Sequence, residues 1–228
     1  MQDLTDLARL IGLGLAILLP LANPLTSMTL LLSLGEQIPY LERQKQIKQG
    51  AIYVVAIMLV TYYAGAWIMA TFGISIPGLR IAGGLIVAAI GFNMMFPSSA
   101  AEDIPEADKV EAAVQRNRHI PNIAFVPLAL PGTAGPGTIA MIISATATRD
   151  GVVTAATAAW VVAVAPIVVF VLLGLLFWVC LRFAGPLVRI IGHGGVEAIS
   201  RVMGFLLICM GVQFVINGVL EIISQHHA

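Results

Sequence analysis

Residues 127–138 read Pro127-Leu128-Ala129-Leu130-Pro131-Gly132-Thr133-Ala134-Gly135-Pro136-Gly137-Thr138, and they interrupt a long apolar segment. Three prolines and three glycines fall within eleven of these residues. Proline removes a backbone N–H, clashes with the preceding helical turn and pushes the residue before it out of the α region. The stretch therefore predicts a helix that is broken inside its apolar segment.

A shorter interruption lies in the first apolar segment, at Leu19-Pro20-Leu21-Ala22-Asn23-Pro24. Its order resembles Val126-Pro127-Leu128-Ala129-Leu130-Pro131. Asparagine is a good N-cap and proline suits the first helical position, so we expect a new helix to begin at Asn23-Pro24. Gly135-Pro136 is expected to begin the matching helix after the second interruption.

The composition predicts that lipid surrounds both interruptions. The chain is 59% hydrophobic and 11% charged, whereas soluble domains carry about 25% charged residues. A spanning helix needs about 20 residues, and six apolar runs meet that length. They lie near residues 7–34, 50–72, 77–96, 121–146, 152–182 and 198–223. We predict an all-α polytopic membrane protein with six transmembrane helices, of which the first and fourth are discontinuous.

Further matches predict an internal repeat. Gly84 and Gly91 in the third run are echoed by Gly204 and Gly211 in the sixth. A three-helix unit crosses the membrane an odd number of times, so its second copy is inverted, as in many transporters. The predicted parts are a first repeat at 1–96, a charged cytoplasmic linker at 97–120 and a second repeat at 121–228.

Lysine and arginine favour cytoplasmic loops, which predicts the orientation. With the N-terminus outside, the outer segments hold Arg9, Arg80 and Arg149. The cytoplasmic loops then hold Arg43, Lys45, Lys48, Lys109, Arg116, Arg118, Arg182, Arg189 and Arg201. Both termini are therefore expected outside.

The interruptions also predict a binding site, because backbone groups freed inside a membrane must be buried in protein or line a wet cavity. A half-helix N-terminus has free N–H groups and the positive end of the dipole, which suit a carboxylate. The candidate substrate-binding residues are Asn23, Pro24, Thr26, Pro131, Thr133, Gly135, Gly137 and Thr138. The alternative is a pair of proline kinks that only shape helix packing.

Other polar residues carry less information. For the amides Asn93, Gln213 and Asn217, hydrogen bonds between helices are favoured over ligand contact. The central parts of the runs contain no carboxylate, and all four histidines lie in loops or the tail. We therefore predict no enzyme activity, no metal and no cofactor. The expected partners are a small-molecule substrate and the lipid bilayer, not nucleic acid, and a homo-oligomer is left open.

At these residues the chain resembles the MarC family. The resemblance rests on Leu18–Thr26, Ile74–Gly84, Ala124–Ala129 with Thr133–Thr138, and Gly195–Gly204, and it covers essentially the whole chain. It implies a bacterial inner-membrane protein with six spans. Relatives are described as transporters of small neutral amino acids, and the family is grouped with amino-acid exporters of the LysE type.

Three functions are compatible with the residues. The favoured one is transport of small zwitterions such as glycine or alanine. The second is export of larger amphipathic compounds, including drugs. The third is a membrane scaffold or regulator that does not transport and that uses the central loop for a partner.

Overall fold

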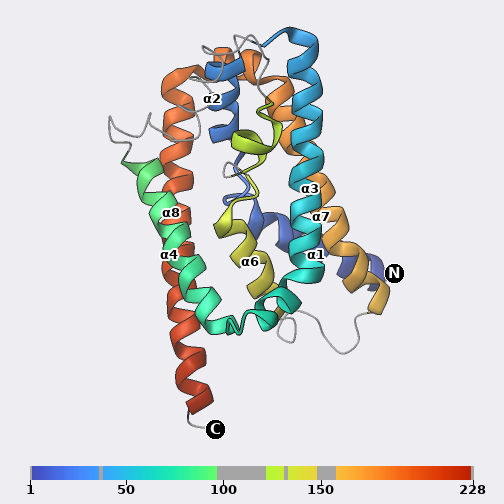
Figure 1. Ribbon diagram of the computed structural model, residues 1–228, viewed down its shortest axis with the longest axis vertical. Helices are drawn as coiled ribbons and strands as arrows, with labels where there is room; N and C mark the ends of the chain where they lie inside the picture. Colours follow the sequence, from blue (N-terminus) through green and yellow to red (C-terminus); the bar gives the residue numbers. More distant parts are fainter. Residues whose placement is uncertain (1, 36–37, 97–121, 131–132, 148–157, 227–228) are drawn as a thin grey trace.

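The computed structural model describes residues 2–35, 38–96, 122–130, 133–147 and 158–226, and every element in these ranges is helical. The predicted linker at 97–120 lies outside the described residues. Figure 1 shows most of the helices running side by side along the long axis. Their bounds are α1 Gln2–Leu18, α2 Pro24–Gly35, α3 Tyr40–Thr71, α4 Ile76–Met95, η1 Ala124–Ala129 (a π-helical turn), α6 Pro136–Ala147, α7 Ala159–Arg182 and α8 Ala184–His226.

Four described helices are long and apolar enough to cross a membrane: α3, α4, α7 and residues Gly194–Gln225 of α8. Large apolar side chains on these helices face outward. Trp67 of α3 is 72% exposed, for example, and Leu175 of α7 is 52% exposed. An apolar surface of this extent fits lipid rather than water. The described part of the chain is therefore all-helical and has the character of a multi-pass membrane protein.

The predicted first and fourth spans are each divided into two short helices. Residues 19–23 separate α1 from α2, and the described residues between η1 and α6, 130 and 133–135, are not helical. Within η1, Val126 has φ −122° and ψ 125°, and Leu130 beyond it is also extended. Both are the conformations expected of a residue just before a proline. The predicted interruptions are thus confirmed in both segments.

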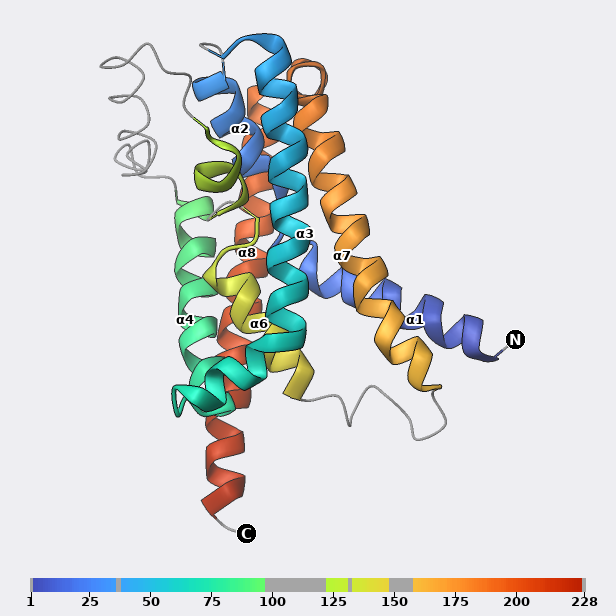
Figure 2. The same ribbon diagram turned by 45° about the vertical axis from the view of Figure 1, so that its right-hand side comes forward.

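The direction of α1 was not predicted. Figure 2 shows α1 crossing α7 and projecting away from the bundle, so it does not run parallel to α2. The five-residue turn before Pro24 redirects the chain, and α1 packs on α7 where Gly14 lies against Val169. Pro20 allows the position of this turn to be predicted from the sequence, but not the angle between α1 and α2.

Other boundaries differ from the apolar runs because a helix continues beyond the hydrocarbon region until a cap ends it. α3 begins at Tyr40, directly after Pro39, and not near residue 50. α4 follows after a short turn in which Gly73 adopts φ 66° and the Ser75 side chain caps Gly78 N–H at 3.2 Å. α8 begins at Ala184 and is kinked at Gly192.

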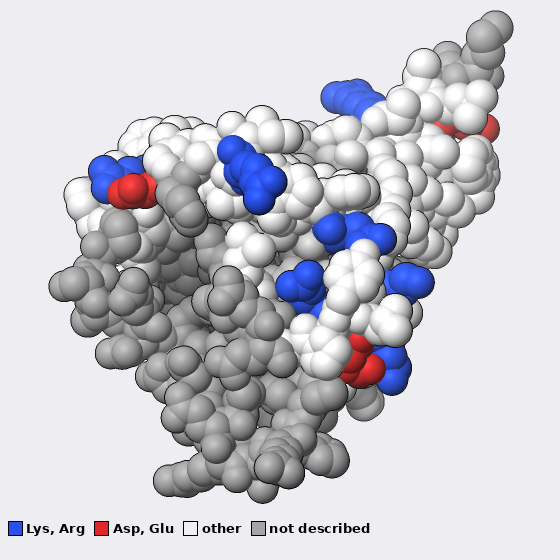
Figure 3. Space-filling model, turned by 90° about the horizontal axis from the view of Figure 1, so that it is seen from above, with Lys and Arg blue, Asp and Glu red and all other residues white. Residues whose placement is uncertain are grey.

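Basic side chains gather at one end of the bundle. Figure 3 looks onto the end where α3 begins and α7 ends, and Lys and Arg side chains lie over it. Arg182 at the end of α7 donates to the Tyr40 hydroxyl at the start of α3, which joins the two helices there. The described basic residues near this end are Arg43, Lys45, Lys48, Arg182, Arg189 and Arg201. Elsewhere among the described residues, Arg9 lies on α1 and Arg80 is buried.

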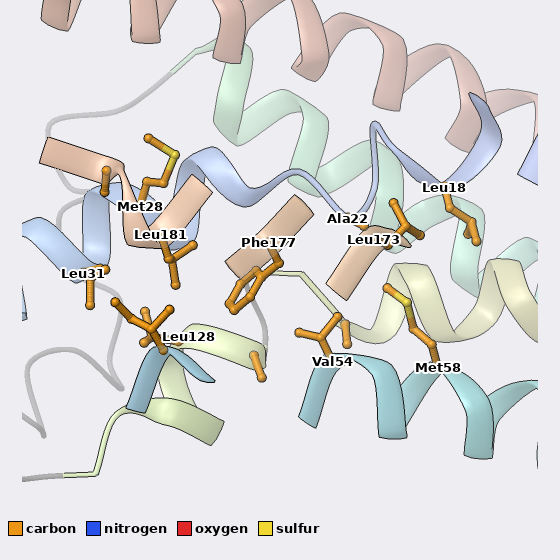
Figure 4. Close-up of a cluster of buried hydrophobic side chains, with 14 of the residues drawn as sticks. Leu18, Ala22, Met28, Leu31, Val54, Met58, Leu128, Leu173, Phe177 and Leu181 are labelled. Atoms are coloured by element: carbon orange, nitrogen blue, oxygen red, sulfur yellow. The ribbon is translucent and has the colours of Figure 1, made fainter. Parts of the chain in front are cut away.

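The hydrophobic core surrounds both interruptions. Figure 4 shows Phe177 of α7 between Leu128 of η1 and Val54 of α3, with Leu173 of α7 beside Ala22. Phe177 is 1% exposed and Leu128 is fully buried. Ala22, at the first interruption, belongs to the same cluster. Because apolar side chains pack around both, the irregular backbone is held inside protein rather than exposed to lipid.

Candidate functional site

The first half-helix begins as its sequence predicts. Asn23 precedes α2, and its Oδ1 accepts a hydrogen bond from Leu25 N–H at 3.1 Å. Pro24 occupies the first helical position, where a missing N–H costs nothing. The predicted cap at Asn23 is therefore confirmed.

The second half-helix begins at Pro136, directly after Gly135, as predicted. Gly135 is buried, and Thr138 donates from Oγ1 to the Thr133 carbonyl oxygen at 3.0 Å. This bond folds the irregular backbone back onto the first turn of α6. The helix starts correspond as Pro24 and Pro136, whereas the sequence match aligned Pro24 with Pro131.

The two interruptions contact each other directly. Ser27, one turn into α2, donates from Oγ to the Leu128 carbonyl oxygen of η1 at 3.0 Å. The same Oγ lies 3.4 Å from Thr133 Oγ1. Ser27 is fully buried and Thr133 is 1% exposed. One serine thus joins segments more than a hundred residues apart.

A small cavity lies where the half-helices begin. Its volume is about 40 Å³, and its walls include Asn23 from the first interruption and Gly135, Gly137 and Thr138 from the second. α4 and α8 close it with Val87, Ile90, Met94 and Leu207, and Pro20 and Leu21 complete the lining. A buried water needs only about 10–15 Å³ of such space, so the cavity has room for a few waters.

Asn23 Nδ2 is buried and has no hydrogen-bond partner in the described part of the chain. The whole residue is 7% exposed. An unsatisfied buried donor costs free energy of about 1–3 kcal/mol. Because Asn23 lines the cavity, its amide can donate to an acceptor that enters there.

Half of the predicted site residues thus meet at one cavity: Asn23, Gly135, Gly137 and Thr138. Thr133 is buried beside them and bonds to its neighbours, and Pro24 starts α2. Thr26 falls in the first turn of α2. Pro131 lies outside the described residues.

Two residues that hold the interruptions in place were missed by sequence reasoning. One is Ser27. The other is Gln46 of α3, which is 2% exposed and accepts from Ile123 N–H at 3.1 Å, at the start of η1. The only signal for Ser27 is a polar residue inside an apolar run, and Gln46 looks like part of a charged loop.

The amides of α8 differ from the favoured expectation. Gln213 Nε2 donates to Asn217 Oδ1 at 2.8 Å, and both residues belong to α8. This bond is within one helix, whereas a bond between helices was expected. Both side chains also line a second cavity, which is described below.

Comparison with known proteins agrees with the membrane fold. Residues 8–223 match the family described as MarC family integral membrane protein. The inner membrane protein MarC of Salmonella typhimurium strain LT2 is 56% identical over 223 residues, covering 97% of this chain and 99% of the relative. The protein of that name from Escherichia coli O1:K1 is 57% identical over 222 residues, with the same coverage. No solved structure matches the chain.

Proposed function

The chain belongs to the MarC family of integral membrane proteins, and we propose that it transports small neutral amino acids such as glycine and alanine across the bacterial inner membrane. The substrate would bind between the two interruptions. The observation that carries this proposal is the buried, unpartnered Asn23 Nδ2 in a cavity where two half-helices begin.

The site suits a zwitterion chemically. Asn23 Nδ2 and the N-termini of α2 and α6 would donate to a carboxylate. The Thr138 hydroxyl, whose proton is used on the Thr133 carbonyl, keeps lone pairs that can accept from an ammonium. Among the described residues, no carboxylate side chain lines the cavity. A neutral zwitterion therefore fits it better than a free cation does.

Contacts between helices support an architecture of two inverted three-helix repeats. A Cβ on Gly84 would lie 2.5 Å from the Gly211 carbonyl oxygen, and one on Gly91 would lie 2.5 Å from that of Gly204. If Gly84 corresponds to Gly204 and Gly91 to Gly211, a two-fold axis exchanges these two contacts. The helix pairs follow the same correspondence. α1 packs on α7 as η1 packs on α3, and α2 packs on α8 as α6 packs on α4.

In the conformation described, the cavity has room for a few waters and little more. Val87 of α4 and Leu207 of α8 close it, and Val87 packs against Gly137. Substrate entry would therefore separate the α4–α8 pair from the half-helices. Rocking of one helix group against another around a fixed site is a common transport mechanism.

The basic end of the bundle supports an orientation in which it faces the cytoplasm. The start of α3 and the end of α7 would then lie inside, and the end of α8 would lie outside. With an even number of crossings, both termini would be periplasmic.

The test is flux of labelled glycine and alanine in proteoliposomes that contain the purified chain, with and without Na⁺ and pH gradients. We expect saturable flux that unlabelled small neutral amino acids compete away and that lysine and glutamate leave unchanged. Protein-free liposomes are the control. No flux in either direction under any gradient would overturn the proposal.

A further inference from the structure

A second, larger cavity lies outside the paired interruptions. Its volume is about 750 Å³, and it is lined by residues of α1, α6, α7 and α8, with Tyr62 of α3 and Arg80 of α4. Most of the walls are apolar, including Leu13, Phe170 and Phe214. Ligand sites of drug-sized molecules occupy about 300–1,000 Å³ and have such walls with a few polar groups.

Arg80, Ser144, Gln213 and Asn217 are among the polar residues that line this cavity. Gln213 and Asn217 line it from α8 and are four residues apart, so they share one face of that helix. Glu221 is the next residue in this spacing, and its Oε2 accepts from Arg80 Nη1 at 2.5 Å. Ser144 of α6 accepts from Arg80 Nε at 2.7 Å. Through Glu221, the polar face of α8 therefore contacts Arg80.

Arg80 has an unused donor. Its side chain is 7% exposed, and its Nη2 is buried with no hydrogen-bond partner in the described part of the chain. Guanidinium presents five N–H donors in a planar fork that matches a carboxylate. Buried charge inside a spanning segment is costly and marks functional sites by default. Arg80 also lines the cavity, so the residue with the unused donor borders a space that can hold an acceptor.

We propose that this cavity binds an amphipathic monocarboxylic acid. Its carboxylate would lie on Arg80, and its apolar body would lie against α1, α7 and Phe214. One net negative charge is favoured over two because Glu221 already pairs with Arg80 and repels a second anion. A phosphate dianion would meet this repulsion more strongly. The site rests on its own residues and does not depend on amino-acid transport at the interruptions.

The binding experiment uses the full chain in lipid nanodiscs and equilibrium dialysis of labelled compounds. The first pair is 1-naphthylacetate and its neutral analogue 1-naphthylacetamide. We expect the acid to bind about tenfold more tightly, which is the usual advantage of a hydrogen bond to a charged group. Equal affinities of acid and amide, or no binding of either, would overturn the proposal.

A second pair distinguishes the source of the acid. Octanoate and octanamide represent a chain derived from the bilayer, whereas the naphthyl pair represents a soluble aromatic acid. Tighter binding of octanoate than of 1-naphthylacetate identifies the bilayer as the source, and the reverse identifies soluble compounds. Both results support an amphipathic acid in the cavity.

Two variants change the charge in opposite directions. Arg80→Gln should weaken binding of the acid about tenfold and leave the amide unchanged. Glu221→Gln should strengthen binding of the acid at least about threefold, because Arg80 loses its internal carboxylate. Arg201→Gln is the matched control, since Arg201 pairs with Glu197 on the exposed surface. If Arg80 had only a structural role, Arg80→Gln and Glu221→Gln would not change the affinity for the acid in opposite directions.

Because Arg80 joins three helices, a third variant leaves its contacts intact. Ala145 lines the cavity and is exposed, so Ala145→Phe places a ring in the cavity without replacing a core residue. It should lower the affinities for acid and amide together. Unchanged acid affinity in both Glu221→Gln and Ala145→Phe would overturn the proposal even if Arg80→Gln does not fold.

Discussion

The side chain of Asn23 uses its two polar atoms differently. Oδ1 accepts from Leu25 N–H and caps α2, whereas Nδ2 has no partner in the described part of the chain. Serine is about as good a cap as asparagine, but it lacks an amide donor. The two roles of this residue can therefore be separated by substitution.

Asn23→Ser should not lower the unfolding free energy, because the cap is retained and the buried, unpartnered Nδ2 is removed. Amino-acid flux should fall about tenfold, because a hydrogen bond to the substrate carboxylate is lost. Asn23→Ala should lose the flux and should be about 1 kcal/mol less stable than Asn23→Ser, because alanine does not cap α2. Flux in proteoliposomes and thermal unfolding of the same samples measure both. Parent-like flux in the serine variant would contradict a substrate contact at Nδ2.

Ser27→Ala should destabilise the protein by about 1–3 kcal/mol, because the buried Leu128 carbonyl oxygen loses its donor from α2. The matched control is Ser224→Ala. Ser224 makes the same kind of bond, to the Glu221 carbonyl oxygen, but on the exposed end of α8. The control should change stability by less than about 0.5 kcal/mol. Thermal unfolding in detergent compares them, and equal midpoints would contradict the bridge at Ser27.

At this scale the sequence is informative only where the chemistry is local. Asn23-Pro24 and Gly135-Pro136 could be predicted as helix starts because capping depends on adjacent residues. The partner of Ser27 lies 101 residues away, and nothing near Ser27 encodes it. Arg80 was counted as an outer-loop charge. Its burial depends on Ser144 and Glu221, which belong to two other helices.

Among the elements, α8 changes direction at one residue. Gly192 has φ 75° and ψ 159°, a region that is essentially restricted to glycine. A Cβ there would meet no neighbouring atom, so any penalty comes from the backbone alone. Gly194, two residues later, also has open space and has no positive φ.

Gly192→Ala should therefore cost about 1–3 kcal/mol, the typical penalty of backbone strain. Gly194→Ala should be neutral or slightly stabilising, since alanine favours helix by up to about 1 kcal/mol. Thermal unfolding of the two single variants is the measurement. The kink would be contradicted by equal stability of the two.

The α4–α8 pair depends on close backbone contact. A Cβ on Gly211 would lie 2.5 Å from the Gly84 carbonyl oxygen and 2.7 Å from Ala88 N. Gly211→Ala should push the helices apart and cost about 1–3 kcal/mol. Gly12→Ala on α1 has nothing within 4 Å and should be tolerated. If Gly211→Ala unfolds at the parent midpoint, the contact is not as close as described.

The elements were predicted better than their directions. The apolar runs give α3, α4 and α7 because length and hydropathy alone define a span. The interruption at Pro20 could be predicted, but the crossing of α1 over α7 could not. That angle depends on contacts between distant segments, such as Gly14 of α1 against Val169 of α7.

For the whole molecule, the basic end predicts which residues an impermeant reagent can reach. Cys180 and Cys209 are first replaced by alanine, and then Lys45→Cys or Ser224→Cys is introduced. Lys45 and Ser224 are both exposed. Lys45 lies near the start of α3, and Ser224 lies near the end of α8. An impermeant maleimide added to intact cells with a permeabilised outer membrane should label Ser224→Cys and spare Lys45→Cys. Disruption of the inner membrane should make both react, and the reverse pattern would invert the proposed orientation.

The packed surroundings of the small cavity have a consequence for the energy supply of the cell. Each elementary charge that crosses a membrane held at 100 mV dissipates about 2.3 kcal/mol. In the conformation described, the space of about 40 Å³ between the half-helices and Val87, Ile90, Met94 and Leu207 holds only a few waters. Cells that produce large amounts of this protein should therefore keep their membrane potential and their rate of respiration.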